Sequence, residues 1–325
     1  MTRLDIISSP QPLDGLGDTI KIFCAGPIQG APDWQHSLPA IKGVTWICPR
    51  RENYENFDYD QQTSWETLGL RISDSVMFWI PAPKEDIQGR SYAQTTRIEF
   101  GECLGRKKTV FIGIYPDYPG RQYFQNKLSE YNKAQKVHKN LNDLLGEVQE
   151  WVSNRKPGIF FTSDTHFSQE RTLLLSKRPF NSVSDMDWTM IERWNQKVPP
   201  GSTVYHLGDF GEYWPLDYLN GNIKLILGNY EFQDKKELPD ICILGDIWNQ
   251  IIDETKVWMS HEPLKIKEME GFKLFGHIHG RQMVKPWNGV DVGVDCHNYT
   301  PCSLDDIRFY QNALEKGYYD SEVWS

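Results

Sequence analysis

The sequence has no long apolar run, no extended block of basic residues and no closely spaced cysteine pair. No stretch of about 18 apolar residues occurs, so no transmembrane helix and no membrane partner are expected. The formal net charge is −9, and Lys and Arg never form more than short groups, so an extended DNA or RNA track is not expected. The six cysteines form no CxxC pair, which argues against a disulfide framework and against a thiolate zinc site.

The first 20 residues also lack the charged start and apolar stretch of a secretory signal peptide. With reduced cysteines, this indicates a cytoplasmic protein. Its 325 residues, 39% of them hydrophobic, exceed the usual size of one domain, so two domains with separate cores are expected. The composition leaves a homo-oligomer open.

In the first half, short apolar runs alternate with stretches that can be helical. The runs are 20–25, 44–48, 75–80 and 109–114, and the helical stretches are 33–42, 63–72 and 95–106. This alternation predicts an α/β domain with a doubly wound parallel sheet. The polar stretch 121–152 is expected to be a helix or a helix pair. We therefore expect a first domain over 1–120, a helical connector over 121–156 and a second domain over 157–325.

Strands dominate the second half, which begins after the helix-breaking sequence at 156–158. They are expected at 159–163, 202–207, 223–227, 241–244, 255–260, 272–276 and 290–294. One convincing helix, 184–197, is expected to be capped by Ser184. Its predicted apolar side consists of Met186, Met190, Ile191 and Trp194. This pattern predicts two packed sheets with flanking helices.

Five short polar motifs follow these predicted strands, and most of them adjoin a glycine. They are Asp164-Thr165-His166, Gly208-Asp209, Gly228-Asn229, Ser260-His261 and Gly276-His277-Ile278-His279. Glycine lets the chain turn sharply and direct a side chain beyond the edge of a sheet. A mixture of imidazole, carboxylate and amide ligands suits Mn, Fe or Zn, whereas Ca prefers oxygen ligands alone.

The order of these motifs resembles the calcineurin-like metallophosphoesterase family, from residue 158 to about 310. The resemblance implies an αββα sandwich of two sheets and a site for two divalent metal ions, which together activate water and clamp a phosphoryl group. By that likeness the ligands of one ion are Asp164, His166 and His279, those of the other are Asn229, His261 and His277, and Asp209 bridges both. The alternative for each residue alone is a structural His or a capping Asp. Neither His206 nor His297 is expected to bind metal.

Tyr230 is a departure from the family pattern. Members often have GNH followed by an acid, where His stabilises the transition state or protonates the leaving group, whereas this chain has Gly228-Asn229-Tyr230-Glu231. A tyrosine can donate a hydrogen bond, but its usual pKa of about 10 makes it a poorer proton donor and acceptor near neutral pH. We expect metal binding to survive this change, and either the turnover rate or the range of leaving groups to be affected.

The first half carries a second resemblance. The sequences AGPIQGAPDW, WETLGLRISDSVMFWIP and TTRIEFGECLGR are similar to the nucleoside 2-deoxyribosyltransferase-like family. That family implies a flavodoxin-like or Rossmann-like sheet and the cleavage or exchange of N-glycosidic bonds. The resemblance makes Glu99 the nucleophile and Asp74 an acid near the sugar or base. The turn containing Gly26 and Pro27 is expected to present backbone N–H groups to the ligand, at the carboxyl ends of the strands.

Each of these acids also has a structural interpretation. Glu99 could be an exposed helix acid, and Asp74 could cap a turn. The spacing of Thr63 and Glu66 fits a capping box, so we expect Glu66 to be structural.

Together, the two resemblances predict a bifunctional enzyme of nucleotide metabolism with a small nucleotide or nucleoside substrate. One domain would hydrolyse a phosphate ester, and the other would break or transfer an N-glycosidic bond. The alternative is a nuclease or cyclic-nucleotide phosphodiesterase whose first domain only binds nucleotides.

Overall fold

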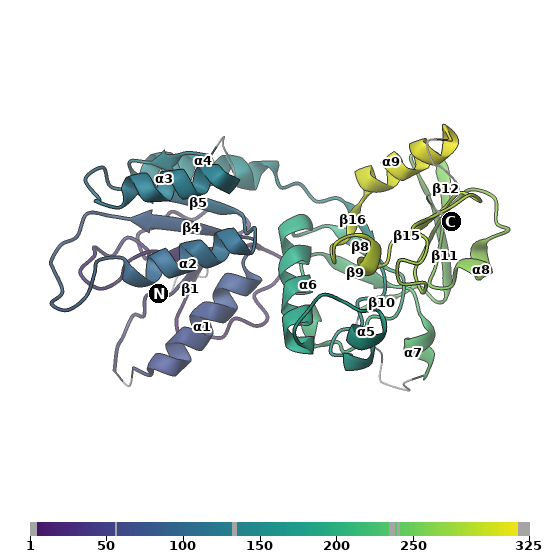
Figure 1. Ribbon diagram of the computed structural model, residues 1–325, viewed down its shortest axis with the longest axis horizontal. Helices are drawn as coiled ribbons and strands as arrows, with labels where there is room; N and C mark the ends of the chain where they lie inside the picture. The colour runs from purple at the N-terminus through teal and green to yellow at the C-terminus, as the bar shows by residue number, and fades with distance from the viewer. Residues whose placement is uncertain (1–4, 56, 132–134, 234–237, 239–240, 318–325) are drawn as a thin grey trace. The chain divides into compact units, whose positions relative to one another are not determined.

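The computed structural model describes residues 5–55, 57–131, 135–233, 238 and 241–317 (Figure 1). The chain divides into two compact units, Met1–Lys156 and Pro157–Ser325. None of the helices in these described ranges is long and apolar enough to cross a membrane.

A parallel sheet of six strands forms the centre of the first unit. The strands are β1 (Ile6–Ser8), β2 (Ile20–Ala25), β3 (Val44–Cys48), β4 (Ser75–Ile80), β5 (Val110–Ile114) and β6 (Val137–His138). Their order in the sheet is β1-β3-β2-β4-β5-β6, and all neighbours are parallel. The chain thus leaves β2 toward β3 on one side and returns to β4 on the other. Ligands of open α/β sheets bind at the carboxyl ends of the strands beside such a reversal.

Helices cover both faces of this sheet. They are α1 (Tyr59–Ile72), α2 (Gln94–Gly105), α3 (Arg121–Tyr131) and α4 (Leu141–Asn154). On one face the ring of Phe100 in α2 packs 5.4 Å from Phe78 of β4, and Phe124 of α3 packs on Phe100. On the other face Trp151 of α4 packs 5.4 Å from Phe111 of β5. The predicted parallel α/β arrangement is confirmed.

Three local expectations for the first unit are wrong. Residues 33–42 form turns rather than a helix, and the buried Trp34 and Leu38 still cover the sheet. The helix expected at 63–72 begins earlier, because Asp58 caps it by accepting a hydrogen bond from the Gln61 N–H. The expected connector 121–156, of which 132–134 lie outside the described ranges, supplies α3, β6 and α4 to the unit itself, because β6 pairs with β5.

Two five-stranded sheets form the second unit. One has the order β10-β9-β8-β7-β16 and consists of β7 (Ile159–Thr162), β8 (Thr203–His206), β9 (Asn222–Leu225), β10 (Cys242–Ile243) and β16 (Cys302–Ser303). The other has the order β11-β12-β13-β15-β14 and consists of β11 (Ile247–Ile252), β12 (Thr255–Ser260), β13 (Phe272–Phe275), β14 (Val284–Lys285) and β15 (Gly289–Asp291). The sheets face each other across a core in which Phe161 and Tyr205 meet Met259 and Leu274.

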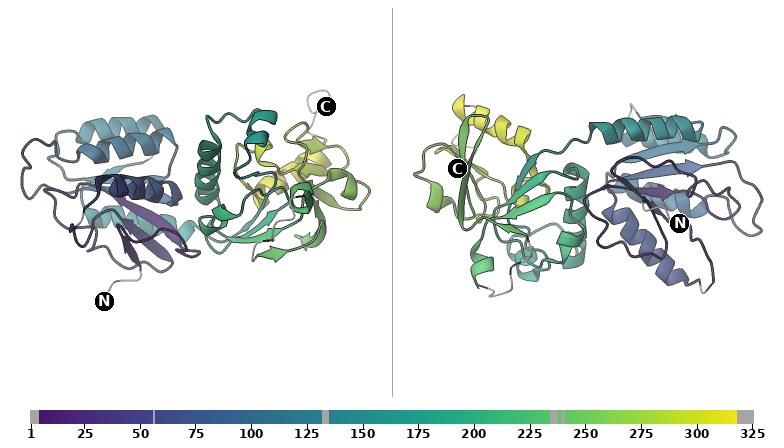
Figure 2. Two further views of the ribbon diagram at one scale, coloured as in Figure 1. Left: turned by 90° about the horizontal axis from the view of Figure 1, so that it is seen from below. Right: turned by 180° about the vertical axis from the view of Figure 1, so that it is seen from behind.

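The helices of this unit are α5 (Glu170–Leu175), α6 (Val183–Lys197), α7 (Asn229–Gln233), α8 (Pro263–Ile266) and α9 (Leu304–Glu315), with short 3-10 turns at Trp214–Asp217 and Val294–Cys296. The predicted apolar side of α6 is confirmed, because its four residues are buried in one core cluster with Phe160, Val204 and Leu225 of the sheet that contains β7. The ribbon of α6 runs beside this sheet (Figure 2). The predicted cap is wrong: Ser182, not Ser184, accepts the hydrogen bond from the Asp185 N–H.

Candidate functional site

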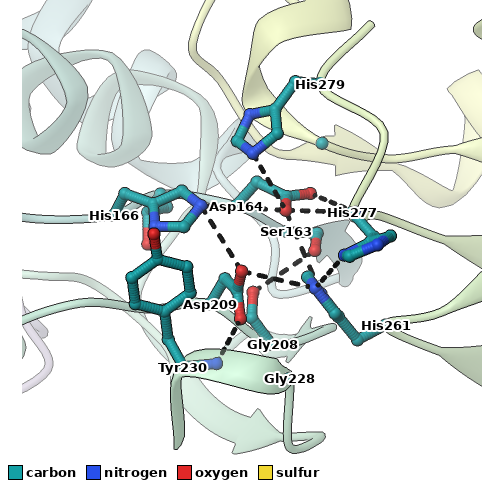
Figure 3. Close-up of polar contacts among 12 residues, drawn as sticks. Ser163, Asp164, His166, Gly208, Asp209, Gly228, Tyr230, His261, His277 and His279 are labelled. Carbon is teal, nitrogen blue, oxygen red and sulfur yellow. Dashed lines mark hydrogen bonds and ion pairs between the residues drawn. The ribbon is translucent and has the colours of Figure 1, made fainter. Parts of the chain in front are cut away.

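All seven residues expected as metal ligands lie just beyond strand ends. Asp164 and His166 follow β7, Asp209 follows β8, and Asn229 begins α7 after β9. The three histidines of the second sheet follow β12 and β13, and their numbers are His261, His277 and His279. Strands β7 to β9 run parallel within one sheet, and β12 and β13 run parallel within the other. Six of the seven residues, all except Asn229, are seen to converge at one place in Figure 3, and Asn229 Oδ1 lies 2.8 Å from His261 Nε2.

The backbone of the site is held in an unfavourable conformation. Five of the seven residues have positive φ angles of 48–74°, namely Asp164, His166, Asp209, His277 and His279. A residue with a Cβ in this region costs about 1–2 kcal/mol. Such strain persists only where the surrounding fold imposes it, and it concentrates at functional sites.

Two glycines make this close approach possible. A Cβ on Gly276 would overlap Ser163 Oγ and Asp164 Oδ2. A Cβ on Gly228 would overlap Asp209 Oδ1 and would lie 2.6 Å from the Asp209 backbone N. The glycines noted beside the motifs therefore leave room for the ligand carboxylates.

One group of candidate ligands surrounds His166. Its Nε2 lies 3.5 Å from Asp209 Oδ2 and 4.0 Å from Asp164 Oδ1, and His279 Nε2 also lies 4.0 Å from Asp164 Oδ1. The ligand atoms of Asp164, His166 and His279 lie within 4.8 Å of one another. Among the described residues His166 Nε2 has no hydrogen-bond partner although it is buried. A buried nitrogen that faces carboxylates at these distances fits a shared cation.

A second group meets on the other side of Asp209. His261 Nε2 lies 3.3 Å from Asp209 Oδ2, 2.8 Å from Asn229 Oδ1 and 3.1 Å from His277 Nδ1. His277 Nδ1 also lies 3.1 Å from Asn229 Oδ1. Asp209 Oδ2 thus lies between the two groups, 3.5 Å from His166 Nε2 and 3.3 Å from His261 Nε2.

Outer hydrogen bonds fix the orientation of the imidazoles. His166 Nδ1 lies 2.7 Å from Gln169 Oε1, His261 Nδ1 lies 2.9 Å from the Leu207 carbonyl oxygen, and His279 Nδ1 lies 2.9 Å from Asp295 Oδ2. These acceptors hold the proton on Nδ1 and leave Nε2 free to bind a metal, which is the usual arrangement of metal-binding histidines.

The electrostatics of the site favour positive charge. Burial by itself lowers the pKa of His261, but its hydrogen bond to Asp209 and the nearby Asp164 outweigh burial and raise the pKa to about 9. Burial by itself raises the pKa of Asp209, and His261 and His166 reverse that effect and lower the pKa. The residues present therefore fit a cation by geometry, donor type and charge.

Tyr230 and Glu231 have different roles beside the ligands. The Tyr230 ring packs edge-on against His166 at 4.8 Å, and its backbone N–H donates to Asp209 Oδ1 (Figure 3). The Glu231 carboxylate accepts hydrogen bonds from three backbone N–H groups, those of Asp209, Phe210 and Gly228. It fastens the loops after β8 and β9 together. The sequence places an acid at position 231 but does not predict that this acid binds the backbone of both loops.

The remaining two histidines of the unit stay outside this constellation. His206 is buried, and its Nε2 lies 2.9 Å from Thr165 Oγ1. Desolvation lowers its pKa to about 3. His297 Nε2 lies 2.7 Å from the Asp291 carbonyl oxygen. Both bonds are consistent with structural histidines.

In the first unit, a pocket lies at the carboxyl ends of β2, β3 and β4, beside the reversal of strand order. Gly26 and Pro27 line it from the turn after β2, and Glu99 lines it from α2. Three of the expected site residues are thus brought together. The aromatic residues Tyr54 and Phe57 add an apolar wall.

Glu66 also lines this pocket. The expected capping box of Thr63 and Glu66 is wrong, because α1 begins at Tyr59 and both residues lie inside the helix. It lies inside α1, where Gln62 Nε2 donates to its carboxylate at 2.8 Å. Desolvation, with contributions from Glu66 and Glu102, raises the pKa of Glu99 to about 8. Burial also raises the pKa of Glu66. Two carboxyl groups that resist ionisation in one pocket are typical of an acid–base or nucleophilic site.

Asp74 does not line this pocket, so its expected role near the sugar or base is corrected. It precedes β4 and therefore lies at the amino ends of the strands, at the opposite edge of the sheet. The buried carboxylate accepts hydrogen bonds from the Lys21 backbone N–H at 2.7 Å and from Arg155 Nη2 at 3.0 Å. Its contacts are those of a structural residue.

The comparisons with known proteins assign a class to the first unit. Residues 19–118 match the family described as nucleoside 2-deoxyribosyltransferase like, and this segment contains every residue that lines the pocket. The first unit therefore contains a nucleoside 2-deoxyribosyltransferase-like domain, as its motifs predicted.

A curated relative covers a longer stretch of chain. The Uncharacterized protein MJ1445 of Methanocaldococcus jannaschii is 30% identical over 183 residues, which are 51% of this chain and 95% of the relative. The chain belongs to the same family as that archaeal protein. A crystal structure of a protein of unknown function, AQ665 from Aquifex aeolicus, has a TM-score of 0.40 and 20% identity, and covers 47% of this chain and 99% of that one.

Proposed function

We propose that the second unit is a metal-dependent phosphoesterase of the calcineurin-like kind. The convergence of seven ligand residues on two adjacent positions supports this proposal. One divalent ion would be held by Asp164, His166, His279 and Asp209, and the other by Asp209, Asn229, His261 and His277. Mn, Fe or Zn suit this mixture of nitrogen and oxygen donors. Two such ions supply Lewis acidity toward a phosphoryl group and activate water.

The chain's own residues would prepare the site for that chemistry. Gln169 and Asp295 hold two imidazoles with Nε2 inward, and Glu231 fixes the loops of Asp209 and Asn229. Tyr230 would donate a hydrogen bond to the phosphoryl group or to the leaving oxygen, where other members of the family have a histidine.

We also propose that the first unit breaks or transfers an N-glycosidic bond in a nucleoside or nucleotide. The presence of Glu99 and Glu66 in one pocket of the family-matched domain supports this second function. Ionised Glu99 would form a bond to the anomeric carbon as the bond from that carbon to the base breaks. The departing base would take a proton from solvent water, and water or a second base would then attack the anomeric carbon and release the sugar from Glu99.

One assay tests both functions. Purified protein is incubated with Mn and a panel of nucleosides and nucleotides, and both free phosphate and free base are measured. Phosphate release should stop in chelator and in Asp209→Asn, whereas base release should persist in chelator and disappear in Glu99→Gln. Full phosphate release by Asp209→Asn would contradict the metal-dependent site. A complete absence of free base would favour a binding module in the first unit.

The alternative, a nuclease or cyclic-nucleotide phosphodiesterase, is separated by the bond that is cut. Activity on bis(p-nitrophenyl) phosphate above that on p-nitrophenyl phosphate would favour it, and the reverse preference would favour a monoesterase.

A further inference from the structure

A cavity of about 490 Å³ adjoins the candidate metal site. His277, His279 and Tyr230 form one part of its wall, so it opens directly beside the proposed ligands. The volume lies within the range of about 300–1,000 Å³ that is usual for small-molecule sites. A substrate held at the metals would extend into this space.

Three cationic side chains contribute to the rest of the wall. Arg171 belongs to α5, Lys177 lies in the turn after it, and Arg281 lies two residues beyond His279. None of the described residues that line the cavity is acidic. On a chain with a net charge of −9 such a group of cations is a local exception, and it creates a positive potential beside the site.

These cations are not used to hold the fold together. All three are exposed, and within the described ranges no carboxylate forms an ion pair with them. The neighbouring Arg178 provides a contrast, because it is buried, donates to the Asp164 and Thr165 carbonyl oxygens and pairs with Asp295 at 2.9 Å. Arg178 is structural, whereas the three exposed cations remain available to a ligand.

We propose that the substrate of the metal site carries a second phosphate group, which Arg171, Lys177 and Arg281 bind. This inference rests on the proposed phosphoesterase function. The substrate is a small nucleotide with two phosphates rather than a polymer, because the basic group is confined to one cavity and the sequence has no extended basic track. In the reaction, water adds to the first phosphorus, the P–O bond to the leaving group breaks, and the proton lost by water balances the one the leaving oxygen gains. The second phosphate stays bound during this step.

A binding experiment tests the cavity without any catalysis. Metal-stripped protein is titrated calorimetrically with inorganic pyrophosphate and with orthophosphate. Pyrophosphate should bind more tightly, and the triple variant Arg171→Ala/Lys177→Ala/Arg281→Ala should lose about tenfold or more of that affinity, since a single hydrogen bond to a charged group has roughly this value. The matched control Lys256→Ala/Lys267→Ala/Lys316→Ala removes three exposed cations outside the cavity and should bind like the wild type. Equal losses in both triple variants would overturn the proposal.

Steady-state kinetics then show at which position of the nucleotide the second phosphate is attached. With Mn, kcat/KM is compared for a nucleoside 5′-monophosphate, a nucleoside 5′-diphosphate, a nucleoside 3′,5′-bisphosphate and a short oligonucleotide. Either the diphosphate or the bisphosphate should have a higher kcat/KM than the monophosphate. Arg281→Gln should reduce this ratio of kcat/KM values about tenfold, mainly by raising KM for the nucleotide with two phosphates. Preference for the oligonucleotide, or an unchanged ratio in Arg281→Gln, would overturn the proposal. If none of the substrates is hydrolysed, the proposed phosphoesterase function is wrong. The pyrophosphate titration then still tests whether the three cations of the cavity bind a phosphate group. The single variants replace the triple variant if it does not fold.

Discussion

Asp295 lies 2.9 Å from His279 through one carboxylate oxygen, and the same carboxylate forms an ion pair with the buried Arg178. This contact positions the imidazole that faces Asp164. The ion pair and the hydrogen bond also lower the pKa of Asp295 to about 2, although burial by itself would raise it. Asp295 therefore stays ionised and keeps the His279 proton on Nδ1.

The first prediction is that Asp295→Asn weakens metal binding at this position. Loss of such an outer partner usually costs about 10–100-fold in metal affinity. Competitive titration with a chromophoric chelator would measure the dissociation constants of the two metal ions. The constant of the ion beside His279 should change far more than that of the other ion. The control Asp305→Asn neutralises an exposed acid on α9 and should leave both constants unchanged. Unchanged affinities in Asp295→Asn would exclude the positioning role.

The second prediction concerns Tyr230, which packs against His166 and which we propose as a hydrogen-bond donor to the leaving group. Tyr230→His should raise the rate on alkyl phosphates about 10–100-fold, because a general acid with a pKa near neutrality protonates a poor leaving group. The rate on p-nitrophenyl phosphate should change little, since nitrophenolate needs no proton. The hydroxyl itself is tested by Tyr230→Phe, which should slow the alkyl substrates further. A uniform change on both substrates would argue against leaving-group protonation.

The candidate metal ligands could be picked out in the sequence because each one follows an apolar run and most adjoin a glycine. Asp164 and Asp209 follow the neighbouring parallel strands β7 and β8, whose carboxyl ends meet in space. His277 follows β13 of the other sheet, and only the family resemblance predicted that it would join them. The cavity cations could not be predicted in this way. Arg171 and Arg281 are over 100 positions apart in the sequence, and their proximity depends on how the loops after β7 and β13 pack.

For the acidic residues of the first unit, the sequence could not predict which ones line the pocket. Glu66 lies within α1 and Asp74 directly precedes β4, and sequence similarity alone favoured the wrong one of the two for the pocket. Topology decides between them, because the residue before a parallel strand lies at the edge away from the ligand. Glu66 is four residues beyond Gln62, so both face the same side of α1, and Gln62 fixes its carboxylate.

The third prediction tests the structural role of Asp74. Asp74→Ala should lower the free energy of unfolding by about 3–5 kcal/mol, because it leaves the Arg155 charge without its buried partner. Base release per folded molecule should be unaffected. Denaturant unfolding and single-turnover rates would measure the two effects. The comparison variant Glu130→Ala removes an exposed ion pair with Lys127 and should change stability little. A stable but inactive Asp74→Ala would restore the catalytic interpretation.

The fourth prediction is a pH dependence set by Glu99. Its pKa in the folded protein is about 8, against an ordinary value of 4.5, mainly because burial disfavours the carboxylate. Below pH 8 the Glu99 carboxyl group of the folded protein is therefore mostly protonated, and it must lose this proton before it can act as a nucleophile. The kcat/KM for base release, which reports the free enzyme, should rise with pH and level off above about 8. Glu66→Gln should move the midpoint to lower pH, because it removes a neighbouring negative charge that raises the Glu99 pKa.

The same proton links Glu99 to stability. Because the pKa of Glu99 is higher in the folded than in the unfolded chain, its contribution to folding is complete below pH 4.5 and declines as the pH rises through 8. In Glu99→Gln this decline should disappear, because the amide does not titrate. Parallel denaturant titrations of wild type and Glu99→Gln at pH 5, 7 and 9 would measure the difference. If both proteins lose stability in parallel over this range, another group is titrating and the assigned pKa of Glu99 is wrong.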